Sequence, residues 1–158
     1  MGRDHTFMDS EFGRFNYDPN DQGEFEPNLV FAIMPFLGKE MDDVYSAIKN
    51  ECKKLNLKSC RVDELTGSGL IIREITYLIE RAEFIICDLS QERPNVYYEL
   101  GYAHGVGNEA LDILLIAKKG TKLHFDISPL RVNYYESIEH LRVIINESLR
   151  DMINKTRG

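Results

Sequence analysis

The chain has 158 residues, 43% of them hydrophobic, and a formal net charge of −7. A chain of this length suits one domain with a substantial buried core. No apolar run approaches the roughly 20 residues of a membrane-spanning helix, and the amino terminus lacks a basic-then-apolar leader pattern. We therefore expect a cytoplasmic protein with no membrane partner.

The negative charge is concentrated at the start of the chain. Residues 1–28 hold seven acidic and two basic residues, so this segment carries −5 of the net charge and the remainder carries only −2. Duplex nucleic acid is bound by clustered Lys and Arg, which this nearly neutral remainder lacks. We therefore expect no duplex nucleic acid partner, whereas a single nucleotide needs only a few local donors.

Residues 1–27 are expected to form an acidic tail outside the domain. They combine Gly, Pro, Asn and Asp with scattered aromatic residues and show neither the period of a strand nor that of a helix. Such a composition is typical of disorder. The aromatic residues leave open the alternative that the tail docks on its own domain or on a partner.

From residue 28 onward, short apolar runs alternate with amphipathic segments. The runs that predict strands are Leu29–Met34, Leu57–Val62, Glu83–Leu89, Leu111–Ala117 and Val132–Tyr135. The segments with helical spacing are Met41–Leu55, Leu70–Ile79, a stretch from Pro94 or Asn95 to about Gly105, and Ser137–Ile153. Continuously apolar strands alternating with helices indicate a parallel sheet covered on both faces. We predict one α/β domain over residues 28–158, with a flavodoxin-like, doubly wound sheet of about five mostly parallel strands in the order 2-1-3-4-5.

The cysteines and glycines argue against several common cofactors. Cys52, Cys60 and Cys87 are odd in number and lie in apolar segments, which is typical of reduced thiols in a core. No Cys/His pair has zinc-site spacing, and neither G-x-G-x-x-G nor a P-loop follows a predicted strand. The sequence therefore predicts no metal and no cofactor bound in the ordinary Rossmann manner.

Polar and aromatic residues follow the predicted strands at their carboxyl ends, where open α/β sheets bind ligands. The residues expected to line this crevice are Pro35, Phe36, Asp63, Asp88, Ser90, Asn95, Tyr98 and Glu99. Carboxylates, an amide and aromatic rings in one place are typical of a small-molecule site. Arg61 or Lys118 could meet a phosphate there.

Glu99 is the most informative of these residues because it falls near the start of its predicted helix, where an anion is favoured. An ionised carboxylate beside a sugar can stabilise or attack an oxocarbenium ion. Alternatively, Glu99 only complements the helix dipole or pairs with a cation. Asp88 could hold a ribose hydroxyl or act as an acid, or could form an Asx turn or a helix cap with Ser90. For Asn95 and Tyr98 the alternatives are a helix N-cap and plain packing.

One stretch of the sequence is similar to a known family. It consists of Phe84-Ile85-Ile86-Cys87-Asp88-Leu89-Ser90, then Pro94-Asn95-Val96-Tyr97-Tyr98-Glu99-Leu100-Gly101-Tyr102-Ala103-His104, then Gly107 and Ile113–Ile116. These motifs resemble those of the nucleoside 2-deoxyribosyltransferase-like proteins and their bacterial TIR-like relatives. The opening Phe31-Ala32-Ile33-Met34-Pro35-Phe36, and Phe125-Asp126-Ile127 with Arg131 and Tyr134, also fit. The resemblance covers roughly residues 29–135.

The resemblance implies N-glycosidic chemistry, with the helix glutamate, here Glu99, as the nucleophile or cation stabiliser and Asp88 as an acidic partner near the sugar or base. This chain departs from the transferases at two places. Ile33-Met34-Pro35-Phe36 replaces a loop that carries a Gly, and Gln91-Glu92-Arg93 stands where they have an aspartate before the catalytic helix. The substrate contacts are therefore expected to differ.

We expect an N-glycosidase or N-ribosyltransferase-like domain that acts on a nucleoside, a nucleotide or NAD, the last as a substrate and not as a cofactor. Pro35 and Phe36 would form an apolar wall, and Tyr98 or Tyr97 would stack on the base. The alternative is a non-catalytic TIR-like module that senses a nucleotide or assembles with itself. Because related sites are often completed by a neighbouring subunit, we expect a homo-oligomer.

Overall fold

The computed structural model describes residues 25–35, 38–62, 69–91, 96, 100–102, 113–123 and 131–157, and the backbone of residues 8–10. The strands are β1 (Met8–Ser10), β2 (Glu26–Ile33), β3 (Lys58–Val62), β4 (Ala82–Asp88), β5 (Ile113–Lys118) and β6 (Val132–Tyr135). The helices with described bounds are α1 (Lys39–Lys54), α2 (Gly69–Arg81) and α4 (Ile138–Arg157). Residues 96 and 100–102 are also helical, within the helix predicted after Pro94 or Asn95.

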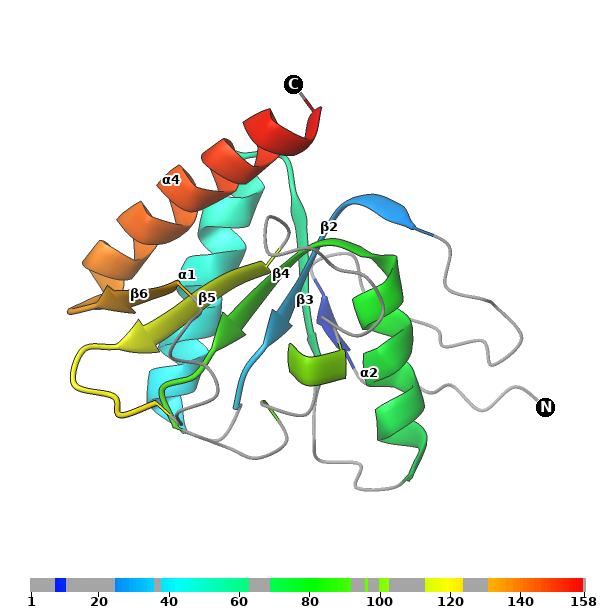
Figure 1. Cartoon of the computed structure of the whole chain (residues 1–158), viewed down its shortest axis with the longest axis horizontal. Helices are drawn as coiled ribbons and strands as arrows, with labels where there is room; N and C mark the ends of the chain where they lie inside the picture. Colours follow the sequence, from blue (N-terminus) through cyan, green and yellow to red (C-terminus); the bar gives the residue numbers. More distant parts are fainter. Residues whose placement is uncertain are drawn as a thin grey trace.

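Strands β2 to β6 form a parallel sheet in the order β3-β2-β4-β5-β6 (Figure 1). Counted along the chain, this is the order 2-1-3-4-5, so the predicted flavodoxin-like arrangement is confirmed. The four innermost residues of β4, Phe84–Cys87, are fully buried, as expected for a strand between two neighbours with covered faces.

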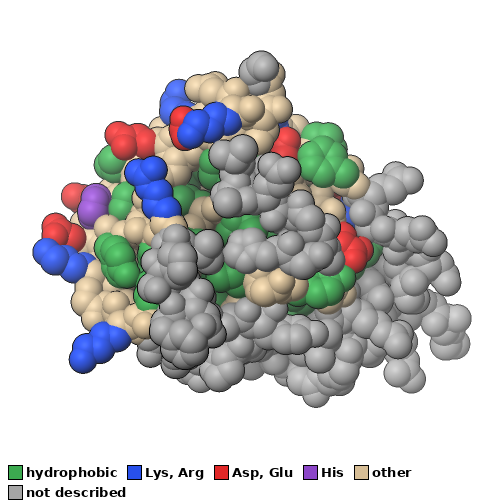
Figure 2. Space-filling model, in the orientation of Figure 1, with side chains coloured by type: hydrophobic (Ala, Val, Ile, Leu, Met, Phe, Trp, Pro, Cys, Tyr) green, Lys and Arg blue, Asp and Glu red, His purple; other side chains and the backbone are tan. Residues whose placement is uncertain are grey.

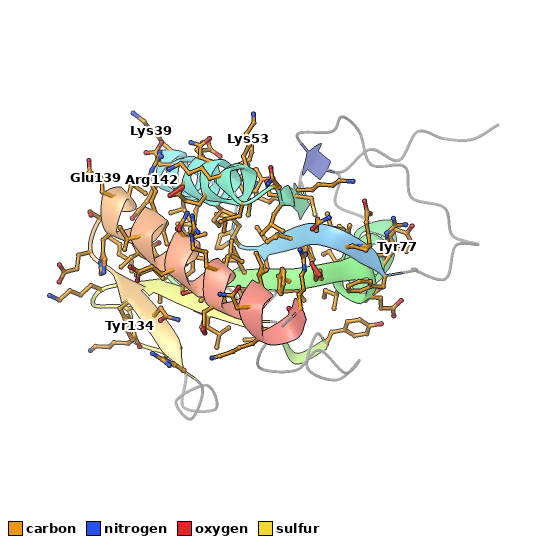
Figure 3. All side chains as sticks on the ribbon, turned by 90° about the horizontal axis from the view of Figure 1, so that it is seen from above. Lys39, Lys53, Tyr77, Tyr134, Glu139 and Arg142 are labelled. Carbon is orange, nitrogen blue, oxygen red and sulfur yellow. The ribbon has the colours of Figure 1, made fainter. Side chains whose placement is uncertain are left out.

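Alternate residues of the strands enter two separate cores. In β2, Phe31 and Ile33 pack with α2, whereas Val30 and Ala32 pack with α1 and α4. Helices α1 and α4 lie next to each other on their side of the sheet (Figure 3). The period-2 alternation of the strands therefore meets helices on both faces.

Helix α4 was predictable from the helical spacing of its apolar residues, which form one stripe. Leu141, Ile145, Leu149 and Met152 recur at helical spacing and are buried against the sheet. The helix continues to Arg157, beyond the predicted end at Ile153. Its last turn contains no further apolar position of this stripe, so the sequence pattern could not place its end.

The amino-terminal segment contains structure that the sequence did not predict. Strand β1 runs antiparallel to β3, with Met8 opposite Val62 and Ser10 opposite Cys60, and β2 begins at Glu26. The structure therefore differs from the expected tail at residues 8–10 and 26–27, while residues 1–7 and 11–24 lie outside the described residues. A sheet edge offers unpaired backbone groups, so three residues can pair there without any apolar period.

Ion pairs hold the edge of the sheet where β2, β3 and β4 begin, which we call the amino edge. Glu26 accepts hydrogen bonds from Arg81 at 2.7 Å and from Lys58 at 3.4 Å. On the same edge Arg157, near the end of α4, donates to Glu83 and to the side-chain oxygen of Asn28. This ring of charges joins the last turn of α4 to the first residues of the sheet.

Candidate functional site

The connections of the sheet change direction between β2 and β4. The chain leaves β2 through α1 to reach β3 on one side, and then returns through α2 to β4 on the other side of β2. In doubly wound sheets the ligand crevice lies beyond the carboxyl ends of the strands at such a switch point. Buried Met34 and Pro35 follow β2 there, and Asp88 ends β4. We call this side of the sheet the carboxyl edge.

Asp88 is held entirely by protein partners. Only 1% of its surface is exposed. Its Oδ1 accepts a hydrogen bond from the backbone N–H of Ser90 at 2.7 Å, and its Oδ2 accepts one from the Tyr135 hydroxyl at 3.0 Å. The bond to Ser90, two residues further on, is the contact of an Asx turn, which was one alternative for Asp88.

Ser90 and Tyr135 complete a network of hydrogen bonds with Asp88, which we call the Asp88–Ser90–Tyr135 cluster. The Ser90 Oγ accepts from the backbone N–H of Lys118 at 2.8 Å and lies 3.1 Å from the Tyr135 hydroxyl. Either hydroxyl can be the donor in the Ser90–Tyr135 bond, and the Ser90 side chain also contacts Asp88. Hydrogen bonds that share partners in this way polarise and strengthen one another.

The cluster shifts the titration of both of its acidic groups. Burial raises the pKa of Asp88 above its ordinary value, against the opposing effect of the hydrogen bonds from Ser90 and Tyr135. Burial and the charge of Asp88 raise the pKa of Tyr135 as well. Tyr135 therefore remains a protonated donor at neutral pH, and Asp88 keeps a proton more readily than an exposed aspartate does.

Charged side chains stand further out on the carboxyl edge. The Nζ of Lys118, at the end of β5, lies 2.6 Å from a carboxylate oxygen of Glu40 in the first turn of α1. Arg61 of β3 stacks on the ring of Tyr45, with 4.5 Å from its guanidinium carbon to the ring centroid. Acidic and basic side chains are intermixed on the face shown in Figure 2. Both cations have acidic partners, since Arg61 also pairs with Asp42 of α1 at 3.4 Å.

Three of the eight predicted site residues are described: Pro35, Asp88 and Ser90, and all three lie on the carboxyl edge. The other five lie outside the described residues: Phe36, Asp63, Asn95, Tyr98 and Glu99. The predicted meeting of Asp88 and Glu99 in one cleft therefore stays a prediction.

Sequence reasoning missed Tyr135 as a site residue. A usable signal was present, because Tyr135 is the last residue of a short parallel strand and so stands at the edge where ligands bind. Its partner Asp88 lies 47 residues earlier in the chain, which no local pattern could indicate.

Comparison with protein-family models and with curated proteins gave no match to this chain. Within the residues that the structure describes, no group of three or more His, Cys, Asp and Glu side chains could hold a metal ion. Among the described helices, none is long and apolar enough to cross a membrane. The candidate site therefore has to be interpreted from its own chemistry.

Proposed function

We propose that this chain is an N-glycosidase or N-ribosyltransferase-like domain that binds a nucleoside, a nucleotide or NAD at the carboxyl edge. The observation that carries the proposal is the position of Asp88, the acid of the Asp-Leu-Ser motif, at the switch point between β2 and β4. The flavodoxin-like strand order supports it. A cytoplasmic location and a homo-oligomeric state belong to the same proposal.

Glu99 carries the chemistry in this proposal. The bond between C1′ of the sugar and the base nitrogen breaks, and the base leaves with the electron pair. Adenine or cytosine then takes up a proton, whereas the nicotinamide of NAD leaves as a neutral molecule and needs none. The carboxylate of Glu99 stabilises the positive charge at C1′ or bonds to it. A water or a second base then attacks C1′ and, where Glu99 has bonded, breaks the C1′–oxygen bond and frees the carboxylate. When water attacks, its oxygen bonds to C1′ and it releases a proton.

The contacts of Asp88 favour an indirect role for this residue. The residue is 1% exposed and its carboxylate accepts hydrogen bonds from Ser90 and Tyr135, so the carboxylate faces the protein interior and not the surface of the carboxyl edge. We infer that Asp88 fixes the segment that leaves β4. The same observation favours the second candidate function, a non-catalytic nucleotide-binding module, because such a module needs only this scaffold.

The test is a product screen with the full chain. NAD, and adenosine and cytidine with and without a 5′-phosphate, are incubated with the protein, and released bases are measured by mass spectrometry. We expect Glu99→Gln to lower the turnover of a cleaved substrate by about a thousandfold or more, because an amide neither attacks C1′ nor balances its charge.

The matched control is Glu139→Gln, which makes the same change at an exposed glutamate in the first turn of α4. This variant should cleave at the wild-type rate. If Glu99→Gln also retains near-wild-type turnover, Glu99 is not catalytic. If no compound is cleaved but one of them binds, the non-catalytic function replaces the enzymatic one.

A further inference from the structure

We propose that Tyr135 is a positioning residue of the candidate site, and that its hydroxyl, on the outermost strand β6, sets the position of Asp88 and Ser90. The inference rests on the proposed function for its catalytic consequence. Its structural part rests on the hydrogen bonds of the cluster alone. No sequence motif assigned a role to this tyrosine.

The cluster joins three neighbouring strands by side chains where their backbone ladders end. Asp88 ends β4, the N–H that Ser90 accepts belongs to Lys118 at the end of β5, and Tyr135 ends β6. Backbone bonds run beside these contacts, from Leu89 N–H to the Ile116 carbonyl and from Lys119 N–H to the Tyr135 carbonyl, each at 2.9 Å. The carboxyl ends of β4, β5 and β6 are thus tied together as one unit.

Tyr135 is suited to a positioning role because its buried ring holds the hydroxyl in one place. The residue is 3% exposed and packs in the core formed with α1 and α4. Its neighbour Tyr134 is 43% exposed and lies on the other face of β6 (Figure 3). Removing the Tyr135 hydroxyl would leave Asp88 Oδ2 buried without this donor, which is costly for an ionised carboxylate.

The link to Glu99 runs along the chain. Ser90 precedes the segment that leads into the next helix, and Val96 and Leu100 of that helix are buried in the core on the α2 side of the sheet. Glu99 stands directly before Leu100 in the sequence. The helix is therefore anchored at Val96 and Leu100, and Ser90 stands six residues before Val96 in the sequence.

Other ionisable groups lie near Asp88 on the elements packed around it. They also influence its titration, so a pH profile must be interpreted with them in mind. Glu40 of α1 raises the pKa of Asp88 by repulsion, and it is itself paired with Lys118 of β5. Tyr135 is the facing titratable group from β6. A change confined to Tyr135 leaves the Glu40–Lys118 pair in place, so a shifted profile can be attributed to the cluster.

The experiment compares Tyr135→Phe with Tyr134→Phe, the same loss of a hydroxyl one residue away. Amide hydrogen exchange measured by NMR needs no substrate. We expect Tyr135→Phe to speed exchange at the Ser90 and Lys118 amides by about tenfold or more, because both donate into the cluster. Tyr134→Phe should leave both amides unchanged. Unchanged exchange in Tyr135→Phe would overturn the proposal, whatever the function is.

Turnover separates this proposal from the proposed function. With a cleaved probe from the panel above, Tyr135→Phe should lower kcat at least about tenfold with little change in KM and should move the acidic limb of the pH profile. If the wild type cleaves and this variant matches it, the positioning role is wrong while the proposed function stands.

A chain that cleaves none of the probes overturns the enzymatic function, and affinity then replaces turnover as the readout. Weaker binding of the bound probe by Tyr135→Phe than by Tyr134→Phe supports the positioning role, and equal binding overturns it. Should Tyr135→Phe fail to fold, Ser90→Ala breaks the same network of bonds at a smaller, half-buried side chain and is measured in its place.

Discussion

The two edges of the sheet each hold a carboxylate beside the core, but they hold it with different partners. At the amino edge, Glu26 accepts hydrogen bonds from the cations Arg81 and Lys58. At the carboxyl edge, Asp88 accepts hydrogen bonds from an amide and a hydroxyl. The pKa of Glu26 is lowered because the contacts with Arg81 and Lys58 outweigh burial, whereas burial prevails at Asp88 and raises its pKa.

This difference indicates a structural role for Glu26 and a carboxylate that takes up a proton more easily at Asp88. A carboxylate neutralised by cations stays ionised over most of the pH range and only joins elements together. A buried carboxylate with neutral partners keeps an uncompensated charge, which costs stability, and such perturbed groups are common at functional sites. The contrast therefore favours the carboxyl edge as the functional one.

The largest stability effect is expected from Glu26→Gln at the amino edge. The change removes the negative charge between Arg81 and Lys58 while keeping the shape of the side chain. We expect a loss of about 1–3 kcal/mol in the free energy of unfolding at pH 7, the usual worth of hydrogen bonds to charged groups. Urea denaturation measures it, with Glu139→Gln as the control. A loss of stability no greater than that of the control would contradict a structural role for the ion pairs of Glu26.

A smaller effect of opposite sign is expected from Asp88→Asn. Because the folded-state pKa of Asp88 is raised from 3.8, its contribution to stability is fully present below that value and is lost as pH rises through the raised value. The asparagine side chain does not ionise, so the variant does not lose stability in this way as pH rises. Its stability relative to the wild type should therefore rise with pH across that window and level off above it.

Urea denaturation of both proteins at a series of pH values from 3 to 7 checks this expectation. Glu26 provides an internal contrast, because its lowered pKa gives a contribution that is present above its ordinary value of 4.5 and disappears as pH falls through the lowered value. A flat or falling difference between Asp88→Asn and the wild type would mean that the buried charge costs nothing at this edge.

The smallest effect is expected from Lys118→Ala. Its ion pair with Glu40 joins two side chains that are each about half exposed, and such pairs contribute about 0–1 kcal/mol. Thermal denaturation should show little change, and the cluster should persist because Ser90 bonds to the backbone N–H of Lys118, which alanine keeps. A loss of stability as large as that of Glu26→Gln would contradict this expectation and would give the Lys118–Glu40 pair a structural role.

The sequence predicted the fold better than the site, for physical reasons. Strand β6 was predicted with the bounds that the structure has. The alternation of buried runs with helices predicted a parallel sheet, and its strand order was taken as the usual one of flavodoxin-like folds. The Asx turn of Asp88 was foreseen as an alternative because its partner is two residues away. The bond from Tyr135 was not, because it depends on the parallel pairing of β4, β5 and β6, and pairing between distant strands leaves no local pattern.

Strand β1 covers the outer side of β3. Without it, β3 would present the backbone N–H and C=O groups of Cys60, Arg61 and Val62 along an edge to which a strand of another chain could add. Short edge strands are poor templates for such addition, and β1 has only three residues. We therefore expect that removal of residues 1–24 makes the protein associate through β3 as its concentration rises. The melting temperature should change little.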